Sequence, residues 1–289
     1  MRIFVLGNAL KEGVTAEVER RLPFLRRHAD VLAVDLQQQA NLAELDGPDL
    51  ALVFGGDGAI LRAARQMGYQ QIPVLGVNLG RLGFLADVYP QELEERFLDI
   101  VRGGYRVTRH IMFECVIELG HEGGWRPVHT SLGLNEIVIY TIPPMHMLDL
   151  HIEVDDVEAA HFSGDGLIIS TPIGSTGHNL SAGGPILNQE LPAFVLTPIC
   201  PHALTYRPVV DAAERVYTIR IGRQCEQAVL IVDGQEDQIL QCGERVRLRR
   251  APVDFHLARV PNRGYYQTLR DKLRWGTPPN YRGEPHPIP

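Results

Sequence analysis

The stretch that most constrains the fold of this chain is Ala51-Leu-Val-Phe-Gly-Gly-Asp-Gly-Ala-Ile-Leu-Arg-Ala-Ala-Arg65. The apolar run from Leu50 to Phe54 predicts a buried strand, and a glycine turn joins it to a helix. Such a unit directs backbone N–H groups and a helix N-terminus at one point, which suits a phosphate. Asp57 is the one ionisable side chain in that turn, and a carboxylate is a poor phosphate ligand. We therefore expect phosphoryl transfer, with Asp57 binding a metal or accepting a proton. A tight strand–helix connection without a ligand is the alternative.

Composition limits the classes of protein to consider. A chain of 289 residues is long for one core, so we expect two domains, and 45% apolar with 22% charged residues is typical of a soluble globular protein. The net charge of -7 and the absence of a long basic run argue against a nucleic-acid-binding surface. No apolar run is long enough for a membrane span. Four cysteines without a CxxC pair favour reduced thiols, and the chain starts directly with a strand-like segment, so we expect a cytoplasmic protein.

Residues 1–105 alternate between strand-like and helix-like segments. Charged segments with apolar residues on one face predict a helix from Glu12 to His28, weakened near its end by Pro23, and a helix that Pro90 opens and Gly103-Gly104 ends. Continuous apolar runs separated by helices are typical of a parallel sheet covered on both faces. The sequence therefore predicts a Rossmann-like α/β domain, with strands at Ile3–Leu6, Val31–Leu36, Leu50–Phe54 and Val74–Val77.

Residues 106–261 change to the two-residue period of strands. Alternation at 111–119 and 148–154, with a turn at 121–124, predicts an all-β domain that we expect to be a β-sandwich. Further strands are predicted at 215–221, 227–232, 245–248 and 254–260. The tail, 262–289, contains one weak helical segment around 267–275 and a proline-rich end, so it could be loose or fold back on the first domain.

A run of hydroxyls and glycines lies within the β region, from Ser163 to Gly184. Hydroxyl groups donate and accept hydrogen bonds without charge, so this segment suits a neutral ligand such as a ribose and base. A glycine- and serine-rich loop without a ligand is the alternative. Asn135 and Glu136 stand at the head of an apolar strand, and by themselves they are most often a strand-edge feature. In the segment from Ser163 to Gly184, the hydroxyls that could bind such a neutral ligand are those of Ser170, Thr171, Ser175, Thr176 and Ser181.

With these motifs the sequence resembles the NAD kinases, over nearly its whole length. That family belongs to a superfamily with the diacylglycerol and sphingosine kinases and the phosphofructokinases. The glycine turn is shared across the superfamily, whereas the hydroxyl-rich segment together with the Asn-Glu pair is close to diagnostic of NAD kinases. The matching segments are Gly55-Gly-Asp-Gly58, Val77-Asn-Leu-Gly-Arg-Leu-Gly-Phe-Leu85, Asn135-Glu136, Asp165 to Gly184, Pro201-His202, Arg207-Pro208 and Asp233-Gly-Gln235.

The resemblance implies transfer of the γ-phosphoryl group of ATP to the 2′-hydroxyl of the adenosine ribose of NAD, which makes NADP. Asp57 would be the proton acceptor that activates this hydroxyl, since a secondary alcohol is too weak an acid to ionise by itself. Arg62, one helical turn on, could reach a phosphate, or it is an exposed helix arginine. The NAD-binding residues implied are Gly58, Arg62, Asn135, Glu136, His146, Asp165, Thr176, His178, Ser181 and Gln235.

The family further implies Mg²⁺ or another divalent cation with ATP, a homodimer or homotetramer, and a C-terminal tail that packs back on the first domain. No cluster of metal ligands stands out in the sequence. One departure is Thr176-Gly177-His178, where the family usually has Thr-Ala-Tyr: an imidazole stacks on a base with less area than a phenol. A lipid or sugar kinase with the same glycine turn is the alternative enzyme. A non-catalytic dinucleotide-binding regulator is the alternative of another class, and Asp57 argues against it because a carboxylate beside phosphates weakens binding.

Overall fold

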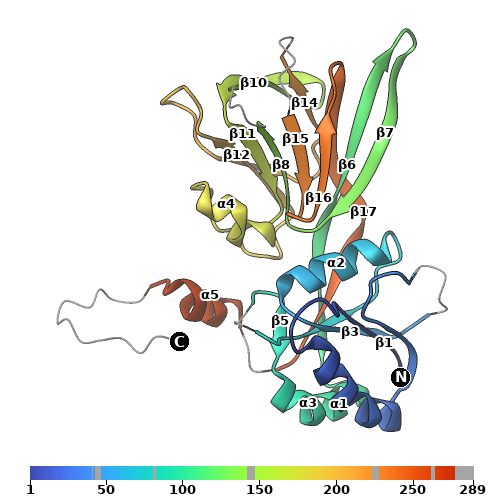
Figure 1. The fold of residues 1–289 in the computed structure, drawn as a ribbon. Helices are drawn as coiled ribbons and strands as arrows, with labels where there is room; N and C mark the ends of the chain where they lie inside the picture. The colour runs from blue at the N-terminus through green and yellow to red at the C-terminus, as the bar shows by residue number, and fades with distance from the viewer. Residues whose placement is uncertain are drawn as a thin grey trace.

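The structure, a computed structural model, describes residues 1–40, 42, 47–80, 83–141, 147–222, 228–261 and 264–276. Figure 1 shows an α/β part at one end of the molecule and a β part at the other, with α2 between them. The N-terminus lies in the α/β part. Two features of this arrangement position the candidate site: a parallel sheet whose strands end near α2, and strand ends of the β part that face α2.

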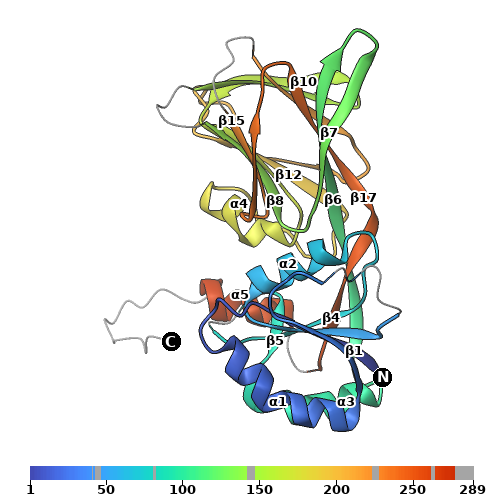
Figure 2. The same ribbon diagram turned by 45° about the vertical axis from the view of Figure 1, so that its right-hand side comes forward.

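The α/β part is built on a parallel sheet. Its strand order is β2 (Asp30–Asp35), β1 (Arg2–Gly7), β3 (Leu50–Phe54), β4 (Val74–Val77) and β5 (Ala86–Val88). Helices α1 (Val14–His28) and α3 (Leu93–Val101), the latter after the short 3₁₀ helix η2 (Pro90–Glu92), cover one face, and α2 (Asp57–Met67) covers the other (Figure 2). Because both faces are covered, β3 and β4 are buried throughout, which explains their unbroken apolar runs. The predicted α/β fold is confirmed.

Helix α1 ends at His28, as the sequence predicts, and Pro23 does not interrupt it. Val18 and Leu25 are buried on either side of the proline and anchor both halves of the helix to the sheet. Apolar packing therefore outweighs the hydrogen bond that Pro23 cannot donate.

The β part is a sandwich of two mainly antiparallel sheets, which confirms that prediction. The core between the sheets contains Phe113, Ile139, Leu150, Ile169 and Tyr217, all of them fully or almost fully buried. One sheet contains β6 (Arg106–His121), β7 (Gly124–Gly133), β17 (Glu244–Arg259), β14 (Tyr217–Ile221), β9 (Leu148–Val154) and β10 (Val157–Gly164). The other has the order β13 (Val209–Ala212), β12 (Ala193–Ile199), β11 (Gly166–Ser170), β8 (Glu136–Thr141), β15 (Ala228–Val232) and β16 (Glu236–Leu240).

Strand β17 joins the two parts. The sequence predicts two strands here, at 245–248 and 254–260, and this is wrong: Glu244–Arg259 is one strand with a register shift between Arg250 and Asp254. Pro252 lies in that irregularity, a position that tolerates proline because the ladder hydrogen bond is already interrupted. Near its end β17 pairs in parallel with β4, through Leu257 and Val74, so a single sheet extends through both parts. The domain limits at 105/106 and 261/262 stay a prediction.

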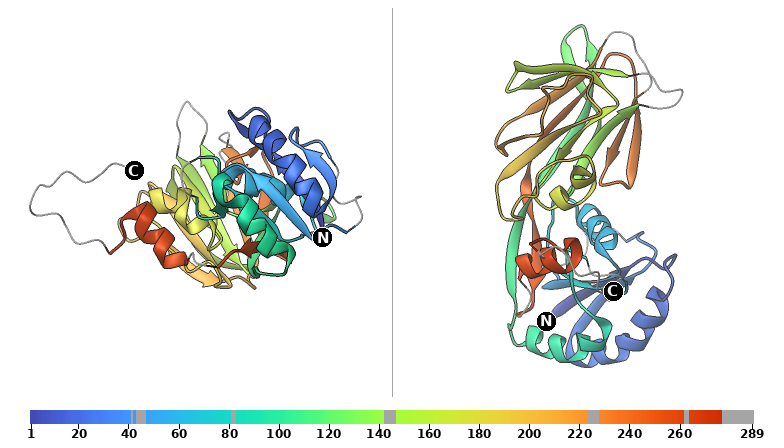
Figure 3. Two further views of the ribbon diagram at one scale, coloured as in Figure 1. Left: turned by 90° about the horizontal axis from the view of Figure 1, so that it is seen from below. Right: turned by 90° about the vertical axis from the view of Figure 1, so that its left-hand side faces the viewer.

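Three short elements complete the fold: η3 (Gly174–Thr176), α4 (His178–Ser181) and α5 (Tyr265–Leu273). Figures 1 and 3 place α4 at the end of the β part that faces α2. Helix α5 contacts both parts, because the Lys272 ammonium lies 4.5 Å from the centre of the Phe84 ring and the Tyr265 hydroxyl donates to the carbonyl of Leu187. Among the described helices, none is long and apolar enough to cross a bilayer.

The cysteines depart in one respect from the expectation of reduced thiols. Cys115 is buried and free, and Cys200 is exposed and free. Cys242, by contrast, is disulfide-bonded, so the expectation is wrong for this residue. Spacing alone gave no signal of this bond, because no two cysteines form a CxxC pair.

Candidate functional site

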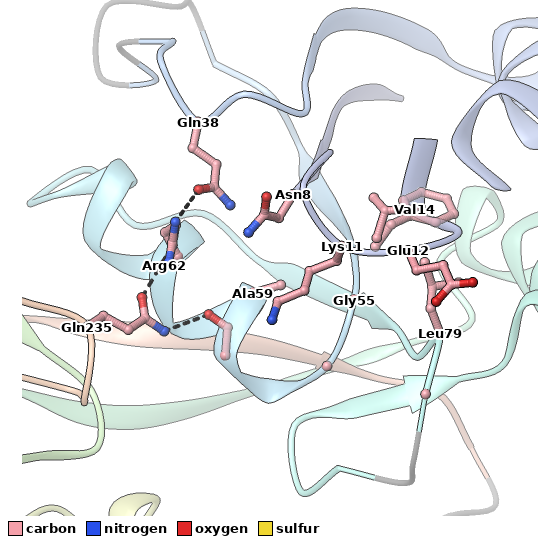
Figure 4. Close-up of a pocket in the computed structure, with 14 residues that line it drawn as sticks. Asn8, Lys11, Glu12, Val14, Gln38, Gly55, Ala59, Arg62, Leu79 and Gln235 are labelled. Carbon is pink, nitrogen blue, oxygen red and sulfur yellow. Dashed lines mark hydrogen bonds between the residues drawn. The ribbon is translucent and has the colours of Figure 1, made fainter. Parts of the chain in front are cut away.

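A cavity of about 480 Å³ lies where β1, β3 and β4 end. The connection after β1 runs to α1 on one face of the sheet, and the connection after β3 runs to α2 on the other. In open α/β sheets, ligands bind in the crevice at such a reversal, outside the carboxyl ends of the strands. Figure 4 shows side chains from several elements around this cavity, among them Asn8, Lys11, Gln38, Arg62 and Gln235.

The glycine turn forms one wall of this cavity. Gly55 has a φ of +148°, and a Cβ there would lie 2.8 Å from the Cβ of Ala59, so only glycine fits the turn. Gly56 precedes α2 without a side-chain cap, which leaves N–H groups of the first turn open to a ligand. Lys11 and Arg62 bring positive charge to the same cavity. A helix N-terminus beside two cations suits the phosphates of a nucleotide.

Asp57, the first residue of α2, is held by the loop that follows β4. Its Oδ2 accepts a hydrogen bond from the N–H of Phe84 at 2.8 Å, and its Oδ1 accepts one from Leu85 at 3.0 Å. Gly83 packs directly against this carboxylate, because a Cβ there would lie 1.9 Å from Oδ1. The carboxylate is half-buried, and each oxygen keeps a lone pair for a further donor. Asp57 is thus fixed in orientation while it can still accept a proton.

A buried ion pair supports the loop that holds Asp57. Arg259, at the end of β17, donates from Nη1 to Asp87 Oδ1 at 2.6 Å, and both side chains are nearly inaccessible to solvent. Its Nη2 donates to the carbonyl of Phe84 at 3.2 Å and to Oε1 of Gln189 at 3.0 Å. The residue whose N–H binds Asp57 is therefore also held through its carbonyl, by an arginine from the last strand.

Gln235 connects the β part to α2. Its amide nitrogen donates to the carbonyl of Gly58 at 2.8 Å, and its Oε1 accepts from Arg65 at 2.9 Å and from Arg62 at 3.4 Å. It follows the turn between β15 and β16, where Asp233 and Gly234 both have positive φ. Gln235 therefore links the glycine turn of the α/β part to the β15–β16 connection of the β part by hydrogen bonds.

Asn135 and Glu136 meet the β15–β16 turn at the start of β8. The buried Asp233 carboxylate accepts hydrogen bonds from the N–H groups of Leu134, Asn135 and Glu136. Burial raises the pKa of Asp233 to about 6, although these three N–H donors lower it. Burial and then the charge of Asp233 raise the pKa of Glu136 to about 8. Among the described residues, the buried Oε2 atom of Glu136 has no hydrogen-bond partner, so it can accept a donor from a ligand.

Comparison with known proteins identifies the family. Residues 5–105 match the ATP-NAD kinase N-terminal domain and residues 134–260 match the ATP-NAD kinase C-terminal domain. The chain is 42% identical to an NAD kinase of Rhodopirellula baltica, over 95% of this chain and 86% of that protein. It is 38% identical to an NAD kinase of Geobacter sulfurreducens, over 90% of each chain. The chain belongs to the ATP-NAD kinase family.

Two solved kinase structures share the fold of this chain. A crystal structure of an NAD kinase from Archaeoglobus fulgidus in complex with ATP has a TM-score of 0.75 and 28% identity, and it covers 95% of this chain and 99% of that chain. Yeast NADH kinase complexed with NADH has a TM-score of 0.85, covering 97% of this chain and 89% of that one. At 22% identity, the yeast comparison shows the fold alone.

Part of the hydroxyl-rich segment, Ser163 to Gly184, does not contact a ligand site as the sequence predicts. Ser170, Thr171 and Ser175 are completely buried, and their hydroxyls donate to backbone carbonyls, including those of Asn135 and Leu134. They therefore do not form a ligand surface, and that interpretation is wrong for these three residues. Their hydrogen bonds instead fix the segment against the Asn135-Glu136 pair.

The remaining residues expected to bind NAD lie in different places. Thr176, His178 and Ser181 are on η3 and α4, and the side chains of His178 and Ser181 are exposed there. Asp165 precedes the first residue of β11, whereas Ser170, the last residue of β11, pairs with Glu136. At 3.3 Å per residue, Asp165 is about 16 Å from Ser170. Within one chain, Asp165 and Glu136 therefore lie at opposite ends of the pair of strands β11 and β8. His146 lies outside the described residues.

Gly177, where the family usually has alanine, lies close to Glu136. A Cβ at this position would be 3.3 Å from the unpartnered Oε2 of Glu136 and 3.2 Å from the carbonyl oxygen of Gly174. Both distances are tighter than ordinary contacts, so the departure leaves additional room beside the Glu136 carboxyl.

Several residues of the site were not predicted from the sequence. Lys11, Asn8 and Gln38 line the cavity but belong to loops without a motif. One signal could have identified Lys11: the chain has only two lysines, and this one follows the first strand of an α/β domain, where ligands bind. Gly83 belongs to the motif Val77–Leu85 in the sequence, but only the structure shows why a side chain is excluded there.

Proposed function

We propose that this protein phosphorylates NAD at the 2′-hydroxyl of its adenosine ribose, using ATP, with Asp57 as the proton acceptor. The observation that carries the proposal is the Asp57 carboxylate at the N-terminus of α2, aligned by the N–H groups of Phe84 and Leu85 beside a cavity suited to phosphates. Relatives at 38–42% identity are named NAD kinases. A catalytic carboxylate beside a phosphate cavity is the combination that phosphoryl transfer to an alcohol requires.

The proposed step moves one proton and one phosphoryl group. The ribose O2′ forms a bond to the γ-phosphorus as the bond from that phosphorus to the β–γ bridging oxygen breaks, so ADP leaves. The hydroxyl proton passes to the Asp57 carboxylate. The N–H groups at the start of α2, with Lys11 and Arg62, balance the charge of the transferring group.

The nucleoside side of NAD is proposed to meet Asn135 and Glu136. The unpartnered Oε2 of Glu136 would accept a hydrogen bond from a ribose hydroxyl or a base amino group, which removes part of the penalty of its burial. Thr176, His178 and Ser181 are proposed as further contacts, on η3 and α4 at the end of the β part that faces α2 (Figure 3). Gly58, Arg62, Asp165, His146 and Gln235 complete the proposed NAD-binding set.

A divalent cation is proposed to enter with ATP. Mg²⁺ is commonly held by one or two carboxylates, water and the substrate's own phosphates. Among the described residues, the exposed Glu12 lines the glycine-turn cavity and Asp57 lies in the turn beside it, so few carboxylates are available and an ion would be held mainly by ATP. When bound, Mg²⁺ neutralises charge on the phosphates.

The resemblance to the family also supports a homodimer or homotetramer in the cytoplasm, and a division into domains 1–105 and 106–261. The two family models cover residues 5–105 and 134–260, in agreement with this division. The tail is proposed to pack back on the first domain, and the contact between Lys272 and Phe84 supports this for α5. Light scattering of the purified chain would measure the oligomeric state, and a monomer at micromolar concentration would refute this part of the proposal.

The test of the activity is to incubate the protein with ATP and Mg²⁺ and one acceptor at a time: NAD, NADH, a diacylglycerol vesicle or a hexose phosphate. We expect phosphorylation of a dinucleotide and none of the lipid or sugar. Product from the lipid or sugar alone would replace the proposal with the alternative kinase. Dinucleotide binding without any product would indicate a non-catalytic regulator. Inorganic polyphosphate in place of ATP tests the choice of donor.

A further inference from the structure

Three potential metal ligands lie together on the exposed face of the β9–β10 hairpin. Asp149 and His151 are two residues apart on β9, so their side chains project from the same face. His161 on β10 is directly opposite His151, and Ser163 is opposite Asp149. Leu148, Leu150 and Ile152 alternate with these residues and point into the core, which fixes the polar set on the outside.

The donor atoms of these three residues are within 4.8 Å of one another. Nε2 of His161 lies 2.7 Å from Oδ1 of Asp149, and Nε2 of His151 lies 3.7 Å from Oδ2. Two bonds of about 2.0–2.1 Å at a tetrahedral Zn²⁺ place their donor atoms roughly 3.3 Å apart. The carboxylate–imidazole distances therefore differ from those of a bound site by about half an ångström.

The histidine rings need a larger adjustment, and their surroundings permit it. The rings are stacked, with centroids 4.0 Å apart and planes 10° from parallel, so their lone pairs do not yet point at one spot. Both side chains are more than one third exposed, and the ring torsion of histidine is broad, so rotation about that bond costs little. Arg220, opposite His151 on β14, is paired with Glu153, which directs its charge away from Asp149.

We propose that Asp149, His151 and His161 bind a divalent transition-metal ion of the Zn²⁺ class. Two imidazoles and one carboxylate are ligands that such ions prefer, and a fourth position remains for water or the Ser163 hydroxyl. Mg²⁺ demands oxygen ligands and does not suit this set. In the metal-free protein the Asp149–His161 hydrogen bond holds the site together, and metal binding replaces that hydrogen bond.

This site is separate from the proposed phosphoryl-transfer site. Asp149 is near the start of β9, and β10 runs along the end of the β part that faces away from α2 (Figures 1 and 2). In the described part of the sheet, β10 is the edge strand and β9 is its neighbour, so an ion bound to both strands would cross-link this hairpin. We therefore assign the ion a stabilising role, which does not depend on the proposed function.

Isothermal titration of the full chain with ZnCl₂, after removal of bound metal by a chelator, tests the proposal. We expect one Zn²⁺ per chain, unaffected by excess Mg²⁺, and the visible absorption of tetrahedral Co²⁺ when Co²⁺ replaces it. His151→Ala and His161→Ala are each expected to weaken binding by roughly tenfold or more. His121→Ala removes an exposed histidine at the end of β6 and serves as the matched control, with unchanged affinity.

His151→Gln keeps a polar side chain of similar size and covers the case in which an alanine variant folds poorly. The wild type, but not the His151 variants, is expected to gain thermal stability as Zn²⁺ is added. With NAD and MgATP, NADP formation by zinc-free wild type and by the His151 variants should be equal, which separates this proposal from the kinase proposal. Absence of Zn²⁺ binding overturns the inference, as does equal affinity in the wild type and both alanine variants.

Discussion

Replacement of Gly83 by alanine should misplace the Asp57 carboxylate. The new Cβ would lie 1.9 Å from Oδ1, whereas real Cβ contacts are essentially never under 3.0 Å, so the carboxylate must move by at least the difference, 1.1 Å. It cannot do so and keep its hydrogen bonds to Phe84 and Leu85, which are 2.8 and 3.0 Å long. A displacement of about 1 Å at a catalytic group costs roughly 10²-fold in rate, or about 2.7 kcal/mol of barrier.

The assay is NADP formation from NAD and MgATP, coupled to an NADP-specific dehydrogenase. We predict that Gly83→Ala lowers kcat by about 10²-fold, and a cooperative thermal transition above the assay temperature would show that the variant is folded. Gly120→Ala is the matched control, because a Cβ there meets only ordinary contacts of 3.6 Å or more and the residue lies on β6, outside the site. An unchanged kcat in Gly83→Ala would refute the role assigned to the carboxylate's position.

Two further predictions concern stability. The pKa of Glu136 is raised to about 8, so between its ordinary value of 4.5 and pH 8 the folded chain keeps a proton that the unfolded chain has released, and stability is lost as pH rises through this range. Glu136→Gln should remove the part of this dependence that Glu136 contributes, at most about 1.4 kcal/mol per pH unit, and leave the part that Asp233 contributes below about pH 6. Urea unfolding at about pH 5 and about pH 8 measures it, and an equal change in the free energy of unfolding in both proteins contradicts the assignment. Arg259→Ala should destabilise by about 3–5 kcal/mol, because Asp87 stays buried without its arginine, and Arg259→Lys should recover part of the loss. If urea unfolding shows that Arg259→Ala loses less than about 1 kcal/mol of stability, the Arg259–Asp87 ion pair is as weak as an exposed one and the prediction is contradicted.

The sequence predicts the local elements of the α/β part well. Strands β3 and β4 agree with their predicted limits, because a strand buried on both faces needs an unbroken apolar run and leaves one. The glycine turn is likewise a local feature: Gly55 needs its positive φ whatever surrounds it. Features that depend only on residues close together in the sequence, such as these strands and this turn, could therefore be predicted from the sequence.

Contacts between distant residues could not be derived in this way. Nothing in the sequence near Phe84 shows that its N–H binds Asp57, 27 residues earlier, or that Arg259 binds its carbonyl. Ser170 and Ser175 show the same limit, since a hydroxyl in the sequence does not reveal whether it donates to a ligand or to a buried carbonyl. The bulged strand β17 reads as two strands because its irregularity contains a proline.

The proposed reaction depends most directly on Asp57 as its proton acceptor. The decisive measurement is kcat for NADP formation by Asp57→Asn, which keeps the size of the side chain and removes its basicity, together with the binding of ATP and of NAD to the same variant. We predict that kcat falls by about 10²–10⁴-fold while both nucleotides still bind. A variant that retains the full wild-type rate would show that Asp57 is not the base.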